Sequence, residues 1–300
     1  MSGSLRSEVV FLPLGGCGEI GMNFNLFGHA DQWVAVDCGI TLEQVPDAVR
    51  PSVQMPDLSF IAARREQLAG LIVTHAHEDH LGALPYLWEQ LRCPVYATPF
   101  AAAVLRHKTR GRRGELPSSL IEIEPGEEIK VGPFDIEWIP ITHSTPETCA
   151  LSITTPRSRI LHTADWKIDA DPVVGAAWSS KRFRELGDKG IDAVICDSTN
   201  ALRAGYTPSE GEVAAGRRDR RRRGRLGDAV DRRDRRRDGA RARAGVHRGH
   251  CGHFTSGLGA VESREASSGF SWTQSCGLSM LRSNNLHCPV FSKKLVSHVK

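Results

Sequence analysis

Short apolar runs separated by turn signals fill the first 216 residues of the chain. Some runs alternate apolar and polar side chains with the period of a strand, and others have the spacing of a helix. The pattern predicts strands at residues 8–14, 22–28, 33–39, 71–75, 94–98, 121–124, 128–131, 134–141, 149–155, 159–165 and 191–197. It predicts helices at residues 56–70, 80–91 and 99–107. Strands with interspersed helices indicate a layered α/β fold.

The periodicity ends near Gly216. Residues 217–245 are rich in arginine, contain no lysine and have no recurring apolar positions, so no core-facing side can be drawn for them. We expect this tract to be disordered or solvated. Two interpretations stay open: an arm that binds nucleic acid, or out-of-frame translation of GC-rich DNA, which tends to encode Arg, Gly, Ala and Asp.

Charge divides the chain at the same place. Residues 1–216 contain 19 Lys and Arg against 28 Asp and Glu, a net charge of −9. Residues 217–300 contain 20 basic and 7 acidic residues, a net charge of +13, so the overall value of +4 conceals two regimes.

Composition narrows the class of protein. With 300 residues, 40% of them hydrophobic and 25% charged, the chain is typical of a globular protein with a sizeable core. No apolar run reaches the roughly 18 residues of a membrane span, and the N-terminal apolar run is too short for a signal peptide. The eight cysteines form no CxxC pair, which argues against a zinc ribbon or a dithiol redox motif. Reduced thiols predict a cytoplasmic protein.

One glycine motif resembles a dinucleotide-binding site but lacks its context. Residues 16–21 match the dinucleotide-binding pattern GxGxxG, which has that meaning only between a strand and a helix. The residues that follow alternate like a strand and leave no room for a crossover helix. We therefore expect a tight hairpin turn at these glycines.

The stretch THAHEDHLGALPYL, residues 74–87, carries the strongest chemical signal. His75 and His77 are two residues apart in an extended segment and can point to the same side, and Asp79 and His80 follow at the start of the predicted helix. Neutral imidazoles and carboxylates are ligands that suit zinc in open catalytic sites. The pattern His-x-His-x-Asp-His is much more specific than a single His-x-His pair.

A metal site also needs ligands from elsewhere in the chain. His143 follows the predicted strand 134–141, and Asp165 ends the strand 159–165. Asp37 lies at a similar place in the strand 33–39. Because strand ends of a sheet can lie close together, polar residues at these positions can contribute ligands to one site.

These motifs together resemble the metallo-β-lactamase superfamily, and more closely the ribonuclease J family within its β-CASP group of nucleases. The resemblance extends over about residues 8–215 and rests on GGCGEIGMN (15–23), VDCGI (36–40), THAHEDHLGALPYL (74–87), THSTPE (142–147), HTADWKID (162–169), CDSTNA (196–201) and GYTPSE (205–210). It implies an αββα four-layer sandwich. It also implies two Zn²⁺ ions and a single-stranded RNA substrate with a 5′-monophosphate, cut by 5′-to-3′ exonuclease and endonuclease activity.

The resemblance also implies a role for each site residue. One zinc would lie on His75, His77 and His143, and a second on Asp79 and His80, with Asp165 bridging both. Asp37 would support the site from behind the ligands. Asp79, Asp165 and Asp197 would be the catalytic carboxylates, with Asp197 in the first β-CASP motif.

The chain departs from the family soon after GYTPSE. We expect a metallo-β-lactamase domain at 1–200, the start of a β-CASP insert at 201–216, and a non-matching tail at 217–300. The sandwich would be incomplete, the second zinc weakened, and the homo-oligomer of the family doubtful. His247, His250 and His253 match no family motif. Two other functions stay open: a general metallo-hydrolase of esters or thioesters, and a non-catalytic remnant that binds zinc or RNA.

Overall fold

A computed structural model of the protein describes residues 8–43, 51–110 and 120–217. Residues up to Gly211 belong to one compact unit, and a second unit begins at Glu212, of which the described residues 212–217 are helical. The arginine-rich tract beyond Arg217 and the three histidines at 247, 250 and 253 lie outside the described residues. No helix in the described ranges is both long and apolar enough to cross a lipid bilayer.

The first sheet has six strands in the order β1-β2-β3-β6-β7-β8. Its strands are β1 (Val10–Gly15), β2 (Phe24–His29), β3 (Gln32–Val36), β6 (Leu68–Val73), β7 (Val95–Ala97) and β8 (Leu120–Glu122). The first three are antiparallel, and β3, β6, β7 and β8 run parallel to one another. A separate two-stranded ribbon consists of β4 (Thr41–Glu43) and β5 (Ser52–Gln54).

The second sheet has five strands in the order β13-β12-β11-β10-β9. Its strands are β9 (Glu128–Val131), β10 (Phe134–Pro140), β11 (Cys149–Thr154), β12 (Arg159–His162) and β13 (Ala193–Ile195). Neighbouring strands are antiparallel except for β12 and β13, which are parallel.

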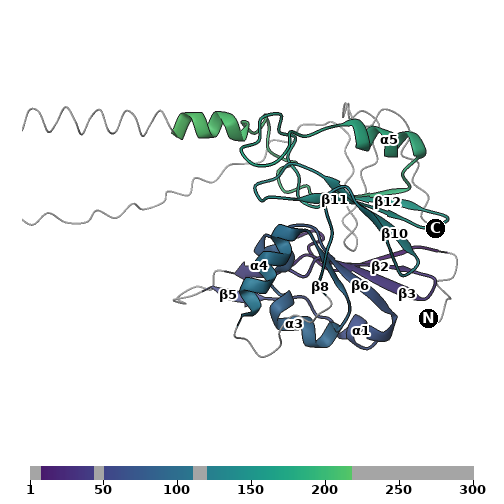
Figure 1. The fold of residues 1–300 in the computed structure, drawn as a ribbon. Coiled ribbons are helices and arrows are strands. Elements are labelled where there is room, and N and C mark those ends of the chain that lie inside the picture. Colours follow the sequence, from purple (N-terminus) through teal and green to yellow (C-terminus); the bar gives the residue numbers. More distant parts are fainter. Residues whose placement is uncertain (1–7, 44–50, 111–119, 218–300) are drawn as a thin grey trace, which may run out of the picture. The chain divides into compact units, whose positions relative to one another are not determined.

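Helices cover the outer faces of both sheets (Figure 1). The helical segments that precede β13 are α1 (Ser59–Ala62), η1 (Arg65–Gln67), α2 (Glu78–Leu81), α3 (Leu84–Leu91), α4 (Pro99–Thr109) and α5 (Lys181–Lys189). Side chains from α1, α3 and α4 pack on the first sheet, and Phe183 and Leu186 of α5 pack on the second.

Strand β3 shows how alternation builds the layers. Trp33 and Ala35 point to the core under the helices, whereas Val34 and Val36 point to the core between the two sheets. The core between the sheets also contains Trp138 of the second sheet, which is fully buried. Because both faces of the central strands are buried, the fold is the predicted αββα sandwich.

Two predicted helices are divided in the structure. The predicted helix 56–70 contains only α1 and η1, and β6 already begins at Leu68 because its apolar residues continue the sheet. The predicted helix 80–91 is interrupted at Gly82 and Ala83, between α2 and α3. Pro85 has no N–H to donate and would clash with a preceding carbonyl in a continuous helix, so it lies in the first turn of α3 instead.

The structure also contains elements that the pattern did not predict, namely α5, the β4–β5 ribbon and the helical residues 210–217. At the glycine motif the prediction is confirmed in part. Residues 16–23 connect β1 and β2, which are antiparallel, so the connection is a hairpin loop, but a longer one than the tight turn that was predicted. Gly16, Gly18 and Gly21 all have positive φ. The motif is a turn between two strands and has no helix after it.

Candidate metal centre

The candidate ligands follow the ends of strands from both sheets. His75 and His77 come after β6, and His77 leads directly into α2. His143 comes after β10, and Asp165 comes three residues after the end of β12. Candidate ligands that are far apart in the sequence therefore lie close together in the loops that follow strands of the two sheets.

The first cluster combines three imidazoles and one carboxylate. His75, His77, His143 and Asp165 each offer a ligand atom, and these atoms lie within 4.8 Å of one another. The Nδ1 atom of His77 is 3.1 Å from Nε2 of His75 and 3.1 Å from Nε2 of His143. His77 is thus the central member of the cluster.

The second cluster lies beside the first and shares Asp165. It consists of Asp79, His80 and Asp165, again with ligand atoms within 4.8 Å of one another. The Oδ1 atom of Asp165 is 3.3 Å from His80 Nε2, and its Oδ2 atom is 3.6 Å from His143 Nε2. One carboxylate therefore turns one oxygen to each cluster, which is the arrangement of a bridging ligand.

Asp37 supports the second cluster from a fully buried position. Its carboxylate accepts hydrogen bonds from the backbone N–H of Thr74 at 2.8 Å and from the Thr74 hydroxyl. It also lies 2.8 Å from Nδ1 of His80. With a proton on Nδ1, the Nε2 atom of His80 is left facing Asp79 and Asp165. A carboxylate behind a histidine fixes the ring orientation in this way in known metal sites.

Protonation states in the first cluster suit metal binding. Burial, together with the neighbouring imidazoles, lowers the pKa of His75 well below its usual value, and burial also lowers the pKa of His143. Burial opposes ionisation of Asp165, but hydrogen bonding to His80 outweighs it and lowers the pKa of this carboxyl. Neutral imidazoles and an ionised carboxylate are the forms that bind metal.

The residue before Asp165 has a strained backbone conformation. Ala164 has φ +50°, a left-handed conformation that costs a residue other than glycine about 1–2 kcal/mol. Its N–H donates to Nδ1 of His162 at 3.1 Å, and burial lowers the pKa of that histidine to about 4. His162 is therefore neutral, with its Nε2 atom buried and without a hydrogen-bond partner among the described residues.

Asp197 lies close to the clusters but belongs to neither of them within the described part of the chain. Its backbone N–H donates to the Thr163 hydroxyl at 3.1 Å, and its carbonyl accepts from the Trp166 indole at 3.3 Å. Its negative charge acts on His143, where it raises the pKa against the effect of burial. The structure thus places Asp197 beside the loop that carries Asp165.

Sequence reasoning missed one residue of the centre, Asn23. Its side-chain amide donates to the carbonyl of Asp79 at 3.1 Å, and the same nitrogen is 3.2 Å from His80 Nε2. Its backbone N–H also reaches the Asp79 carbonyl, at 3.0 Å. The signal was present, because Asn23 ends the motif GGCGEIGMN, but a single sequence gives no role to it.

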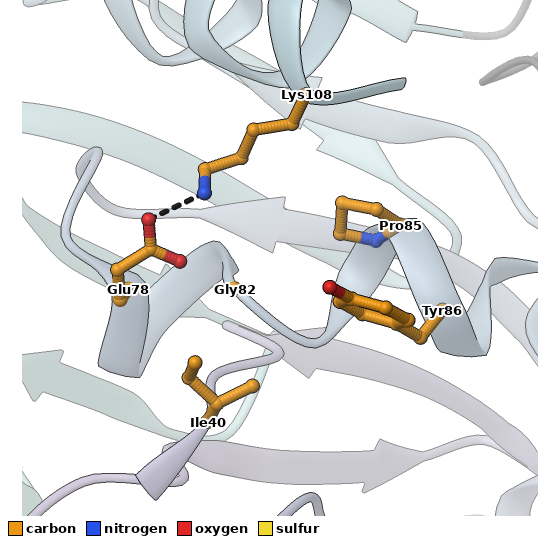
Figure 2. Close-up of a pocket in the computed structure, with 6 residues that line it drawn as sticks. All are labelled: Ile40, Glu78, Gly82, Pro85, Tyr86 and Lys108. Carbon is orange, nitrogen blue, oxygen red and sulfur yellow. Dashed lines mark hydrogen bonds and ion pairs between the residues drawn. The ribbon is translucent and has the colours of Figure 1, made fainter. Parts of the chain in front are cut away.

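Two carboxylates tie the ligand loops to α4. Figure 2 shows Lys108 of α4 reaching across a small hollow to Glu78, which directly precedes Asp79. Glu147, in the loop that carries His143, accepts a hydrogen bond from the backbone N–H of Phe100 at 2.7 Å and so caps the start of α4. Both loops are thereby held against one helix.

The donor set fits a metal ion. Four imidazoles and two carboxylates converge in the two clusters. Burial opposes protonation of His80, but the carboxylates of Asp37, Asp165 and Asp79 outweigh it and raise the pKa of this ring well above its usual value, so a cation is favoured at this place. A divalent metal ion would supply that positive charge, and the mixture of imidazole and carboxylate ligands is the one that Zn²⁺ takes in catalytic sites. The His/Asp clusters are therefore compatible with a metal site.

Gly39 allows the close approach on which the centre depends. A Cβ atom at this position would lie 1.6 Å from the carbonyl oxygen of Asp79. We expect Gly39→Ala to displace α2, to lower the free energy of unfolding by about 1–3 kcal/mol, as overpacking does, and to weaken zinc binding. Gly187→Ala in α5, where nothing lies near the added Cβ, should instead stabilise the protein by about 0.5–1 kcal/mol. Denaturant unfolding and zinc titration of both variants check this, and equal behaviour would contradict it.

Comparison with known proteins places these clusters in context. The sequence model described as "Beta-lactamase superfamily domain" matches residues 32–195. A protein named Ribonuclease J from Sinorhizobium meliloti is 46% identical over 213 residues, and one of the same name from Helicobacter pylori is 37% identical over 210 residues. These matches include 69% and 70% of this chain, but only 37% and 30% of the relatives. The chain thus spans about a third of the length of the relatives it matches.

Among solved structures, the metallo-β-lactamase fold protein YhfI from Bacillus subtilis matches 53% of this chain and 63% of its own length. The sequence identity is 23% and the TM-score is 0.38. A likeness this distant carries no argument about activity.

Proposed function

Since the chain belongs to the β-lactamase superfamily and, through residues 8–215 or so, to the ribonuclease J family, we propose that it is a zinc-dependent ribonuclease that hydrolyses phosphodiester bonds of RNA. The observation that supports this best is the shared carboxylate of Asp165, which turns one oxygen to each of two adjacent ligand clusters. Two adjacent metal ions are the arrangement that many phosphodiester hydrolases use.

In this proposal His75, His77 and His143 hold one zinc ion, Asp79 and His80 hold the other, and Asp165 holds both. The first cluster has four ligand residues and the second has three, one of them shared. We therefore expect the second ion to bind more weakly than the first. Zinc bound there would activate water near neutral pH and would stabilise negative charge on the phosphate oxygens.

The residues of the chain supply orientation and proton handling. Asp37 holds the His80 ring so that its Nε2 atom faces the ligand cluster. Asp79 is partly exposed beside His80, and hydrogen bonding to His80 holds the pKa of its carboxyl below the usual range despite burial. An ionised carboxylate at this place can accept a proton from the attacking water. Asp197, whose charge acts on His143, is the other candidate for proton handling.

We propose single-stranded RNA with a 5′-monophosphate as the substrate, with both 5′-to-3′ exonuclease and endonuclease cleavage, in the cytoplasm. The resemblance of residues 8–215 to the family supports this choice. Charge argues for a low affinity, because residues 1–216 carry −9 and repel the RNA backbone. The basic residues 217–300 would add only attraction that does not depend on RNA sequence and weakens with salt.

The test uses the full chain, zinc and two single-stranded RNAs that differ only in a 5′-monophosphate or a 5′-hydroxyl. We expect slow zinc-dependent cleavage, faster for the 5′-monophosphorylated RNA, and none by the variant His77→Ala. A thioester substrate is assayed in parallel. Zinc-dependent hydrolysis of the thioester without RNA cleavage would favour a general metallo-hydrolase, and zinc binding without either activity would favour a non-catalytic remnant.

A further inference from the structure

Asp169 is a buried carboxylate near the metal centre that takes no part in either ligand cluster of the described residues. The residue is only 2% exposed. It accepts hydrogen bonds from Lys167 Nζ at 2.6 Å, from the backbone N–H of Asp171 at 3.0 Å and from the backbone N–H of Glu210 at 2.9 Å. The hydrogen bonds from Lys167 and Asp171 lower the pKa of the Asp169 carboxyl, so it is ionised at neutral pH.

The backbone around Asp169 is bonded to the loop of His143. The Asp169 N–H donates to the hydroxyl of Thr142 at 3.2 Å, and the Lys167 N–H donates to the carbonyl of Thr142 at 2.8 Å. The Thr142 hydroxyl in turn donates to the carbonyl of Lys167. Thr142 directly precedes His143, and Lys167 lies two residues after Asp165. The segments that carry these two ligands are therefore joined at this point.

A third segment, distant in sequence, closes the same cluster of bonds. Besides the Glu210 N–H bond to Asp169, the Glu210 carboxylate accepts from the backbone N–H of Val173 at 2.9 Å. The Gly211 N–H donates to the carbonyl of Asp171 at 2.9 Å. Asp169 thus fixes residues 167–173 from two sides, by Thr142 and by Glu210.

We propose that Asp169 is a positioning residue, which holds the His143 and Asp165 segments at the separation that the first metal ion requires. The inference rests on the metal centre of the proposed function but not on the RNA substrate. Both ligands lie in loops outside the strands, so the sheets alone do not fix the distance between them. Metal ligands must be held to within about 0.5 Å of their productive positions, which calls for support of this kind.

The test measures zinc affinity of the full chain by competition with a chelator, together with the absorption spectrum of bound Co²⁺. Asp169→Asn replaces one carboxylate oxygen by an NH₂ group, so in either orientation the amide cannot accept all three hydrogen bonds, and the negative charge opposite Lys167 is lost. We expect zinc affinity to fall about 10–100-fold, the usual effect of losing an outer partner of a metal site, and the Co²⁺ spectrum to change. Asp192→Asn is the matched control, because Asp192 accepts a backbone N–H of Arg159 at 2.8 Å at the far end of β12.

A second pair of variants keeps the carboxylate in place. Thr142→Val removes the hydroxyl that joins the two segments, and Thr142→Ser keeps it. We expect the valine variant to lose zinc affinity like Asp169→Asn and the serine variant to bind like the wild type. This pair decides the matter if Asp169→Asn does not fold.

The possible outcomes distinguish the positioning role of Asp169 from the existence of the metal centre. If the wild type binds no zinc, both are wrong. If the wild type binds zinc and the folded Asp169→Asn and Thr142→Val variants bind it equally well, the metal centre stands and the positioning role is wrong. A loss of affinity as large in Asp192→Asn would also overturn the positioning role, because it would follow from general destabilisation.

Discussion

Replacement of His77 by alanine is expected to remove nearly all stabilisation of the fold by zinc. The Nδ1 atom of His77 is 3.1 Å from nitrogen atoms of both His75 and His143, so no other histidine of the first cluster is as central. Zinc at 1,000 times its dissociation constant stabilises a folded protein by about 4 kcal/mol. The variant should lose most of that increment, whereas its stability in EDTA should change little, because His77 is partly exposed.

Thermal unfolding with zinc and with EDTA measures this difference directly. The matched control is His107→Ala, which removes an exposed histidine of α4 that belongs to neither ligand cluster. Wild type and His107→Ala should show the same rise in unfolding temperature on addition of zinc. An equal rise in His77→Ala would show that the first cluster does not bind the metal.

The variant Asp37→Asn is expected to damage both the fold and the metal centre. Asp37 is fully buried and accepts from the N–H and hydroxyl of Thr74, and it lies 2.8 Å from His80 Nδ1. An asparagine amide turns an NH₂ group toward some of these donors. Removal of one partner from a buried charged pair costs about 3–5 kcal/mol. Loss of the support for His80 should also reduce metal affinity about 10–100-fold.

Asparagine is the informative replacement because Asp37 has φ +64°. Asparagine and aspartate tolerate this left-handed conformation better than most residues, so the backbone can stay as it is and the loss reports the charge. The control is Asp135→Asn in β10, where a half-exposed carboxylate lies 3.4 Å from Lys130. There the change in the free energy of unfolding should stay within about 1 kcal/mol. Denaturant unfolding in EDTA compares the two, and equal losses would contradict the role of Asp37.

The sequence by itself determined the strands of the two large sheets and the order of the candidate ligands. Alternation in WVAV put Trp33 and Ala35 on one face and Val34 and Val36 on the other, because successive side chains of a strand point in opposite directions. The pattern His-x-His-x-Asp-His after a buried strand marked one end of a sheet as a metal-binding edge. This information is local, and it needs only the few residues on either side to be read.

The tertiary structure decided what depends on contacts between distant residues. Helices α2 and α3 are separated at Gly82 and Ala83, where a continuous helix was predicted. Gly39 packs closely against the backbone of Asp79 in α2. The two oxygens of Asp165 face different clusters only because β10 and β12 flank β11 in one sheet, while His75 and His80 come from the other. Asn23 and Asp169 support these ligands through bonds to residues 56 and 41 positions away. No local period encodes such pairings, because sheet order and loop packing bring those side chains together only after the chain has folded.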